Sequence, residues 1–165
     1  MITQPKIDTR SEQPYVGIRV RVAMPDMPTV LPALFDEGAA WLASRSIPIT
    51  KAPFIRYYVT DMAGKLDLEV GYPVEDSSVG DERMKAGVLP AGRYASLLHI
   101  GPYDGLYEAN GVLVDWAKDN GIEWATYQAN GEEVFVSRLE TYLTDPSQEP
   151  DESKWETEVA IRLPD

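Results

Sequence analysis

The sequence predicts an α+β fold built from duplicated β-α-β-β units with pseudo-twofold symmetry, an antiparallel sheet, helices on one face and a central groove. Three observations support this prediction. Some segments alternate between apolar and polar residues, as half-buried strands do, and others carry apolar residues three and four positions apart, as amphipathic helices do. These segments occur in the same order twice along the chain. Short sequence matches recur at corresponding points of the two copies, and an internal duplication explains them most simply.

The first half, about residues 15–75, contains a strand, a helix and two further strands. The strands are rich in β-branched and aromatic residues. The helix prediction uses Thr29 as a cap and places Pro32 in the first turn, where proline is tolerated. An acidic, serine-containing linker follows the last strand. In order, the predicted elements are the strand 15–24, the helix 29–46, the strands 54–61 and 66–74 joined by a turn at Ala63–Gly64, and the linker 75–83.

The second half, about residues 88–165, repeats this order. Gly101–Pro102 separates its first strand from its helix, and Asn120–Gly121 is a typical helix stop. The predicted elements are the strand 92–100, the helix 104–120, the strand 134–144, a polar loop 145–153 and the strand 155–163.

The two halves match each other in sequence at corresponding strands. Residues 57–61 (YYVTD) match residues 141–145 (TYLTD), and residues 66–74 match residues 155–163. Convergence on a common element order is the alternative explanation. A three-stranded unit with one helix leaves an open edge, and two units placed side by side can join their sheets. The joint between them is the natural place for a groove, within one domain that spans residues 1–165.

The composition excludes several classes of protein. The 165 residues include no cysteine and one histidine, so disulfides, thiolate metal sites and histidine-rich metal sites are ruled out, and we expect no metal and no cofactor. No stretch approaches the ~20 apolar residues of a membrane span, and the N-terminus lacks the features of a signal peptide. We therefore expect a cytoplasmic protein. The oligomeric state cannot be read from the sequence.

The charge balance argues against direct binding of nucleic acid. Lys and Arg number 15 and Asp and Glu 27, so the net charge is −12. Proteins that bind duplexes neutralise phosphates with a basic surface, and this sequence has no basic cluster. Solubility alone also explains such a charge.

Glu140 is the first candidate site residue. It lies in the run 135–143 (FVSRLETYL), where alternation separates charged and aromatic residues from mainly apolar ones. We expect the apolar face to point to the helices and the face of Glu140 to point into the groove. A carboxylate beside tyrosines attracts an organic cation through charge and cation–π interaction. The two faces are Arg138, Glu140 and Tyr142, and Leu139, Thr141 and Leu143.

Glu140 also has plainer alternatives. Its face could be solvated, or its carboxylate could pair with Arg138 or with the repeat-equivalent Arg56. The sequence leaves these alternatives open.

Aromatic residues supply the other candidates for the groove. Phe54, Arg56 and Tyr58 occupy the face of the first half that the repeat makes equivalent, with Tyr58 over Tyr142. Cross-strand packing is the alternative for these rings. Trp155 opens the final strand, where its ring walls the groove or caps the core.

The start of the second predicted helix adds two more tyrosines. Tyr103 and Tyr107 are four residues apart and lie on one side of its first turn. His99 precedes them, and we expect it to be structural because no second histidine accompanies it.

Five short motifs occur along the chain, namely 68–74 (LEVGYPV), 89–94 (LPAGRY), 99–103 (HIGPY), 139–143 (LETYL) and 155–159 (WETEV). Together they resemble the GyrI-like small-molecule-binding domains, also called AraC-type effector-binding domains. The resemblance covers about residues 15–163 and implies the duplicated fold, a groove for flat cationic or aromatic molecules, and a ligand-binding acid at Glu140. Many relatives carry a DNA-binding helix-turn-helix domain first. With about 14 residues before its first predicted strand, this chain resembles the stand-alone form, some members of which hydrolyse cyclopropane-bearing natural products.

Three functional hypotheses follow. The first is a ligand sensor or drug-sequestering module that binds small, flat, aromatic or cationic molecules. The second is a hydrolase of reactive drug-like natural products in which Glu140 is the catalytic residue. The third is a module that binds a protein partner such as a topoisomerase, with its negative charge imitating DNA. The expected ligand-binding residues are Glu140, Tyr58, Tyr142, Trp155, Tyr103, Tyr107, Phe54 and Arg56.

Overall fold

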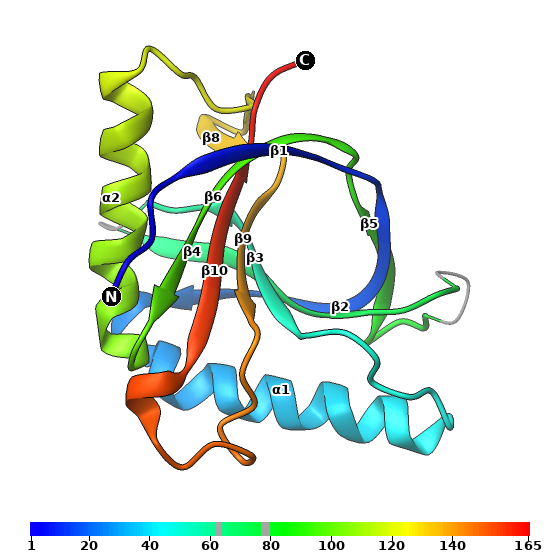
Figure 1. Cartoon of the computed structure of the whole chain (residues 1–165). Coiled ribbons are helices and arrows are strands. Elements are labelled where there is room, and N and C mark those ends of the chain that lie inside the picture. Colours follow the sequence, from blue (N-terminus) through cyan, green and yellow to red (C-terminus); the bar gives the residue numbers. More distant parts are fainter. Residues whose placement is uncertain (62–63, 77–79) are drawn as a thin grey trace.

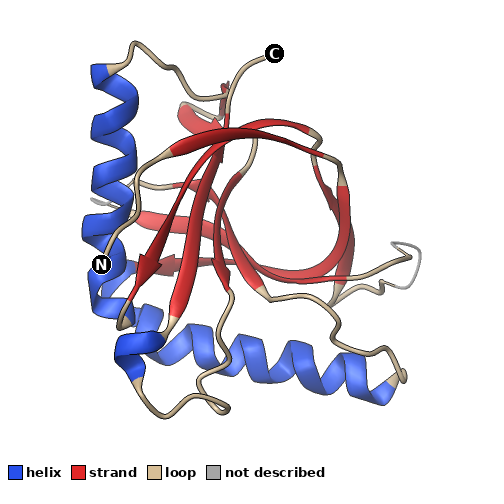
Figure 2. Cartoon of the chain, viewed as in Figure 1, coloured by secondary structure: helices blue, strands red, loops and turns tan. Residues whose placement is uncertain are grey.

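In the computed structural model, which describes residues 1–61, 64–76 and 80–165, eight strands form one antiparallel sheet. Figures 1 and 2 show that this sheet curls on itself and that the two helices lie outside the curl. The strand order is β1 (Lys6–Arg10), β6 (Gly92–Ile100), β10 (Glu156–Arg162), β9 (Arg138–Tyr142), β3 (Phe54–Val59), β4 (Lys65–Pro73), β2 (Gln13–Ala23) and β5 (Lys85–Leu89).

Read from its two ends, the sheet has the same pattern. Strands β2, β4 and β3 of the first half correspond to β6, β10 and β9 of the second, and β3 pairs with β9 at the centre. The two outermost strands are exchanged between the halves. Strand β1, which precedes the first half in the sequence, pairs with β6 of the second half, and β5, which precedes β6, pairs with β2 of the first half. The α+β antiparallel fold is therefore as predicted, with β4 and β10 in equivalent positions. A common origin of the two halves stays a prediction.

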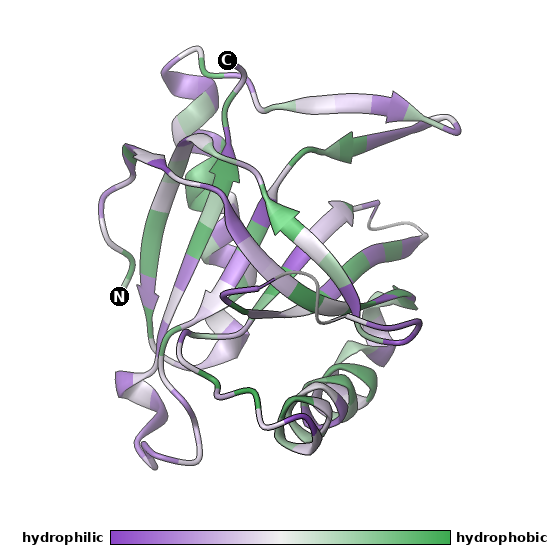
Figure 3. Ribbon diagram, turned by 90° about the vertical axis from the view of Figure 1, so that its right-hand side faces the viewer, coloured by the Kyte–Doolittle hydropathy of each residue, from purple (hydrophilic) through white to green (hydrophobic). Residues whose placement is uncertain are grey.

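Each helix covers one half of the sheet. Helix α1 (Met27–Ser44) packs on β2 and β4, and helix α2 (Leu106–Asp119) packs on β6 and β10. Hydrophobic and hydrophilic residues alternate along the strands (Figure 3), and β2 and β4 turn apolar side chains to α1 as β6 and β10 do to α2. The central strands β3 and β9 lie between the two helices. Among the described residues, neither helix has the length and apolar character needed to span a membrane.

The inner face of the curl has a small core of its own. Its buried members are Tyr15, Phe54, Tyr94, Leu139 and Ala160. Gly71 makes room for this core, because a Cβ atom at that position would lie 2.4 Å from Cζ of Phe54. The Phe54 ring therefore lies directly on the backbone of β4.

Three strands were not predicted. Strand β1 lies within the 14 residues expected to precede the first strand, and β5 follows the predicted linker. The predicted strand 134–144 is divided between β8 (Glu132–Phe135) and β9, and β8 forms a separate hairpin with β7 (Thr126–Ala129). Asn130 and Gly131 turn this hairpin with φ of 53° and 77°, the geometry typical of a two-residue hairpin loop.

The helix starts also differ from the prediction. Helix α1 begins at Met27, after a 3-10 turn at Met24–Asp26, so Pro32 lies inside the helix and not in its first turn. Helix α2 begins at Leu106, after a 3-10 turn at Tyr103–Gly105. Ala63 of the predicted turn and residues 77–79 of the predicted linker lie outside the described residues.

Candidate functional site

Strand β9 turns Glu140 toward the helices, which reverses the predicted assignment of its two faces. Leu139 packs in the core of the inner face with Phe54 and Tyr94, whereas Tyr142 packs beneath both helices. The prediction failed because it assumed that helices cover the centre of the sheet. The helices cover its two halves, so the polar face of β9 lies between them.

The Glu140 carboxylate is buried and held by three neutral donors. Glu140 is 7% exposed. The hydroxyls of Tyr57 and Tyr142 donate to Oε1 at 2.9 and 2.8 Å, and Asn110 Nδ2 donates to Oε2 at 2.9 Å. The donors come from β3, β9 and α2, so the carboxylate ties the centre of the sheet to one helix. No basic side chain of the described residues forms an ion pair with it.

Arg138 lies two positions from Glu140 on the same face of β9. Its Nη2 donates to Oδ1 of Asn110 at 3.2 Å, and its guanidinium lies 4.8 Å from the ring centre of Phe135. Burial lowers the pKa of Arg138 from its usual value, and the charge of Glu140 opposes that shift. The Glu140–Arg138 ion pair that the sequence left open is therefore replaced by an indirect link through Asn110.

Four aromatic rings form a continuous wall beside the carboxylate. The rings of Phe35 and Tyr142 have centres 5.7 Å apart, those of Tyr142 and Tyr103 5.5 Å apart, and those of Tyr103 and Trp155 4.9 Å apart. We call these four residues the aromatic wall. Tyr103 is 37% exposed, so the wall reaches the surface. The Glu140 site comprises this wall with Glu140, Tyr57, Asn110 and Arg138.

Three predicted residues thus lie in the Glu140 site with Glu140, namely Tyr142, Trp155 and Tyr103. Tyr107 does not join them in this structure, because its side chain is 74% exposed on α2. His99 is buried, and its Nε2 lies 2.8 Å from the carbonyl oxygen of Pro102.

The three predicted residues of β3 lie on the inner face, away from Glu140. Phe54 is 1% exposed, and Arg56 donates to the carbonyl oxygens of Val88 and Val136 at 3.2 and 2.8 Å. Tyr58 donates to the buried Glu69 at 2.9 Å. Tyr58 therefore lies on the opposite face of the sheet from Tyr142, and the Glu140–Arg56 pair that the sequence left open does not form.

A one-residue error in the sequence match explains this displacement. Ile55 pairs with Val70, and Glu140 pairs with Val159. Because the matched strands place Val70 over Val159, Ile55 corresponds to Glu140. Tyr57, not Tyr58, then corresponds to Tyr142. A shift of one residue moves a strand's side chains to the opposite face.

Sequence reasoning also missed Asn110 and Phe35. Asn110 interrupts the buried stripe of α2 that contains Leu106, Ala109 and Leu113. A polar residue beside a buried stripe needs a partner, so this position carried a usable signal. Phe35 is one of several apolar residues of α1, and no sequence signal distinguishes it from the others.

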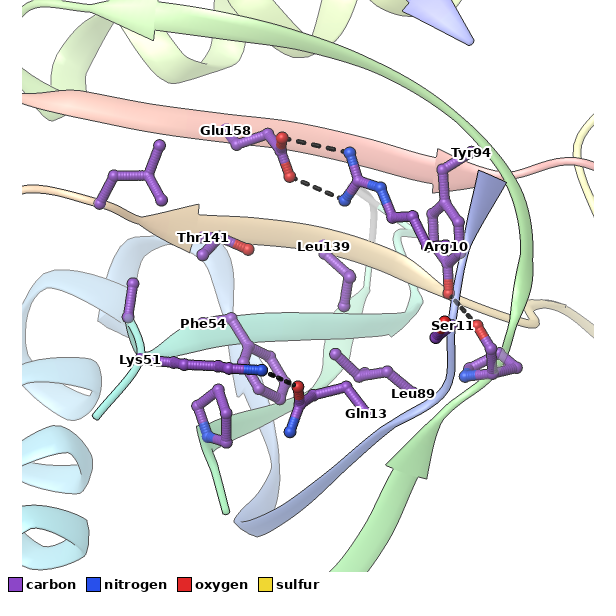
Figure 4. A pocket seen from close by; sticks show the side chains of 14 residues that line it. Arg10, Ser11, Gln13, Lys51, Phe54, Leu89, Tyr94, Leu139, Thr141 and Glu158 are labelled. Atoms are coloured by element: carbon purple, nitrogen blue, oxygen red, sulfur yellow. Dashed lines mark hydrogen bonds and ion pairs between the residues drawn. The ribbon is translucent and has the colours of Figure 1, made fainter. Parts of the chain in front are cut away.

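The inner face contains a depression of about 330 Å³ that is a weaker candidate (Figure 4). Arg10 donates to both oxygens of Glu158 at 2.8 and 3.1 Å and to Asp8 at 2.9 Å, so these charges are already matched. Lys51 donates to Oε1 of Gln13 at 2.7 Å. The apolar floor includes Phe54 and Leu139, which are almost fully buried.

The tyrosines of the Glu140 site remain protonated donors well beyond neutral pH. Burial raises the pKa of Tyr57 and of Tyr142 well above the ordinary value, and the negative charge of Glu140 raises both further. Unfolded tyrosine ionises near pH 10. The stabilisation that the protonated hydroxyls of Tyr57 and Tyr142 give to the folded state is therefore complete below about pH 10. It is lost as the pH rises through the folded-state pKa of these tyrosines.

Replacing Tyr57 with Phe is expected to lower the free energy of unfolding by about 2 kcal/mol at neutral pH. The change removes a hydrogen bond to a charged group and leaves the carboxylate one donor short. Above about pH 10, the variant should lose stability less steeply than the wild type, since one shifted tyrosine is gone. Urea unfolding at several pH values measures both effects. Tyr127→Phe, at a half-exposed ring, is the control. Equal stability of the two variants at neutral pH would contradict the assigned hydrogen bond.

A known protein family matches nearly the whole chain. The sequence model of the GyrI-like small molecule binding domain matches residues 3–164. No curated protein matches significantly.

Several solved structures share the fold. The C-terminal domain of EcmrR superposes with a TM-score of 0.75 at 22% identity, over 98% of this chain and 97% of that one. The EcmrR chain in the cryo-EM structure of its DNA complex superposes with a TM-score of 0.77 at 22% identity over 97% of this chain. This chain spans 57% of the length of that EcmrR chain.

Two further structures are similar at lower identity. SAV2435 bound to tetraphenylphosphonium gives a TM-score of 0.62 at 10% identity, over 98% of this chain and 94% of that one. A hydrolase from Listeria innocua gives 0.60 at 12% identity, over 98% and 92%. At these identities, the likeness establishes a shared fold.

Proposed function

This chain belongs to the family of GyrI-like small-molecule-binding domains, and from that premise we propose that the Glu140 site binds flat aromatic cations. In this role the protein is a ligand sensor or a drug-sequestering module. Glu140 supplies the negative charge, and the aromatic wall supplies the surface on which the ligand stacks.

One observation carries the proposal, namely a buried carboxylate that no basic side chain of the described residues contacts directly. Burying a carboxylate is costly unless it is paired and hydrogen-bonded. Glu140 has three hydrogen bonds from neutral groups, and no described basic side chain pairs with it. An organic cation would supply the missing charge, and the neighbouring rings would add cation–π attraction. SAV2435, which has the same fold, is bound to tetraphenylphosphonium, a lipophilic cation.

Binding fits this carboxylate better than hydrolysis does. A general base must accept a proton from a water molecule within hydrogen-bond reach. In Glu140, Oε1 already accepts from both Tyr57 and Tyr142, and Oε2 accepts from Asn110. A cation can pair with the carboxylate while all three donors stay in place, whereas a water molecule to be activated has only one remaining acceptor position, on Oε2.

The wild-type protein is expected to bind N-methylacridinium at least about tenfold more tightly than acridine above neutral pH, where acridine is uncharged. The two compounds have nearly the same shape, so the difference measures the charge contact, which in a desolvated site exceeds ~1.4 kcal/mol. Isothermal titration calorimetry gives both dissociation constants. Equal affinities, or no binding of either compound, would overturn the proposed function.

Replacing Tyr103 with Ala is expected to weaken N-methylacridinium binding about three- to tenfold. Tyr103 joins Tyr142 to Trp155 in the aromatic wall, and a cation over a ring contributes roughly 0.5–1 kcal/mol or more. The matched control is Tyr127→Ala, which removes a half-exposed ring on the separate hairpin. The wall has no part in binding if both variants keep wild-type affinity in the same calorimetric titration.

A further inference from the structure

Arg138 and Glu140 are opposite charges that lie side by side without forming an ion pair. They occupy alternate positions on one face of β9, where Cα atoms two residues apart are about 6.8 Å apart. Among the described residues, Arg138 forms no ion pair, and its one hydrogen bond is to Asn110. The chain carries 27 acidic residues, so a half-buried arginine without an ion pair beside the Glu140 carboxylate requires an explanation.

The carboxamide of Asn110 occupies the space between the two charges. Its Nδ2 donates to Glu140 at 2.9 Å, and its Oδ1 accepts from Arg138 at 3.2 Å. The same Nδ2 donates to the carbonyl oxygen of Leu106 at 2.9 Å, so this side chain retains a partner within α2 if a ligand takes its place. The amide therefore shows what the two charges recognise together, which is a donor and an acceptor held close to each other.

A simple cation pairs with Glu140 but provides no acceptor for Arg138. Placed at Glu140, it lies close to the Arg138 guanidinium and is repelled by it, since like charges in a partly buried site are only weakly screened. A ligand that also carries an anionic group converts this repulsion into a charge-assisted hydrogen bond. The guanidinium is well suited to that task, because its planar fork matches a carboxylate.

We propose that Arg138 is a specificity-determining residue that binds an acidic group of the ligand, and this proposal rests on the proposed function. The preferred ligand class is then the aromatic zwitterions, in which a cationic centre and a carboxylate lie on one flat ring system. The cationic centre meets Glu140, the carboxylate meets Arg138, and the ring system stacks on the aromatic wall. The ligand replaces the contacts of Asn110 with both charges.

Two probes that differ by one carboxylate test this proposal. N-methylacridinium carries a cation alone, and 10-methylacridinium-9-carboxylate adds a carboxylate on the carbon opposite the ring nitrogen. The wild-type protein is expected to bind the zwitterion at least about fivefold more tightly than the cation. Arg138→Gln is expected to bind the zwitterion on the order of tenfold more weakly than the wild type does, because the charged hydrogen-bond partner of the ligand's carboxylate is gone. The same variant should bind the cation as well as the wild type does or better. Calorimetry gives the ratio of the two dissociation constants in each protein.

The matched control is Lys118→Gln, which removes one positive charge from an exposed position of α2. It should leave the ratio unchanged, and an equal change in both variants would mean that net charge alone is responsible. If Arg138→Gln does not fold, Arg138→Lys keeps the charge and should retain a zwitterion preference. The wild-type ratio is decisive in that case too, since a cation bound as tightly as the zwitterion overturns the proposal.

The outcomes separate this proposal from the proposed function. If both probes bind in a Glu140-dependent way and Arg138→Gln leaves their ratio unchanged, Arg138 does not determine specificity and the proposed function stands. If neither probe binds the wild-type protein, both proposals fail.

Discussion

Replacing Glu140 with Gln is expected to lower the affinity for N-methylacridinium at least tenfold and to leave the affinity for acridine nearly unchanged. Gln keeps the size of the side chain and one carbonyl oxygen for the hydroxyls of Tyr57 and Tyr142, but it removes the negative charge. Hydrogen bonds and contacts to a charged group in a desolvated site typically contribute about 1.5–3 kcal/mol. Stacking on the aromatic wall is the same for both compounds and survives the change.

Titration calorimetry on both ligands checks this result, with Glu123→Gln as the control for the loss of one negative charge at an exposed position. Equal losses of affinity for the cation and the neutral compound would show that Glu140 shapes the site and does not recognise the charge of the ligand. A variant that remains folded at the titration temperature is needed to assign the change to binding. The substitution leaves no new cavity, but it replaces the acceptor of Asn110 Nδ2 with an NH2 donor, so a loss of about 1–2 kcal/mol in the free energy of unfolding is expected.

Replacing Phe54 with Ala is expected to destabilise the protein by about 3–5 kcal/mol, the usual cost of truncating a buried aromatic ring. Phe54 is 1% exposed, and its ring meets Tyr15 at a centroid distance of 5.1 Å. Because it lies on the inner face of the sheet, the protein that remains folded should bind N-methylacridinium as the wild type does. This result would separate Phe54 from the residues of the Glu140 site.

Urea unfolding measures the first effect, and calorimetry at low temperature measures the second. Tyr127→Ala is the control for removing a ring that is largely outside the core. A stability close to that of the wild type would contradict the assignment of Phe54 to the inner core. Selective loss of ligand affinity would return it to the binding residues that the sequence predicted.

Much of the fold could be predicted because it depends on local patterns. Alternation along residues 92–100 and helical spacing along α2 identify those elements without knowledge of their partners. The exchanged strands β1 and β5 were missed because each is five residues long and lies at an edge of the sheet. Their pairing with the opposite half depends on how the chain crosses between the halves.

The candidate site was predicted in part for the same reason. Glu140 and Tyr142 share a face by alternation alone, and that relation holds in any antiparallel arrangement. The choice between Tyr57 and Tyr58 depends on pairing with β4 and β9, where a slip of one residue exchanges the faces. Adjacent tyrosines give no local signal that would fix this register.

Local sequence patterns are enough to predict the order and type of the main elements, the antiparallel α+β class and the two-residue spacing of Arg138, Glu140 and Tyr142. These follow from interactions between residues near each other in the chain. The position of this face between the helices, and the contact of Asn110 of α2 with both charges, depend on long-range packing. Alternation determines which side chains point the same way, but the burial of each face depends on where distant helices pack.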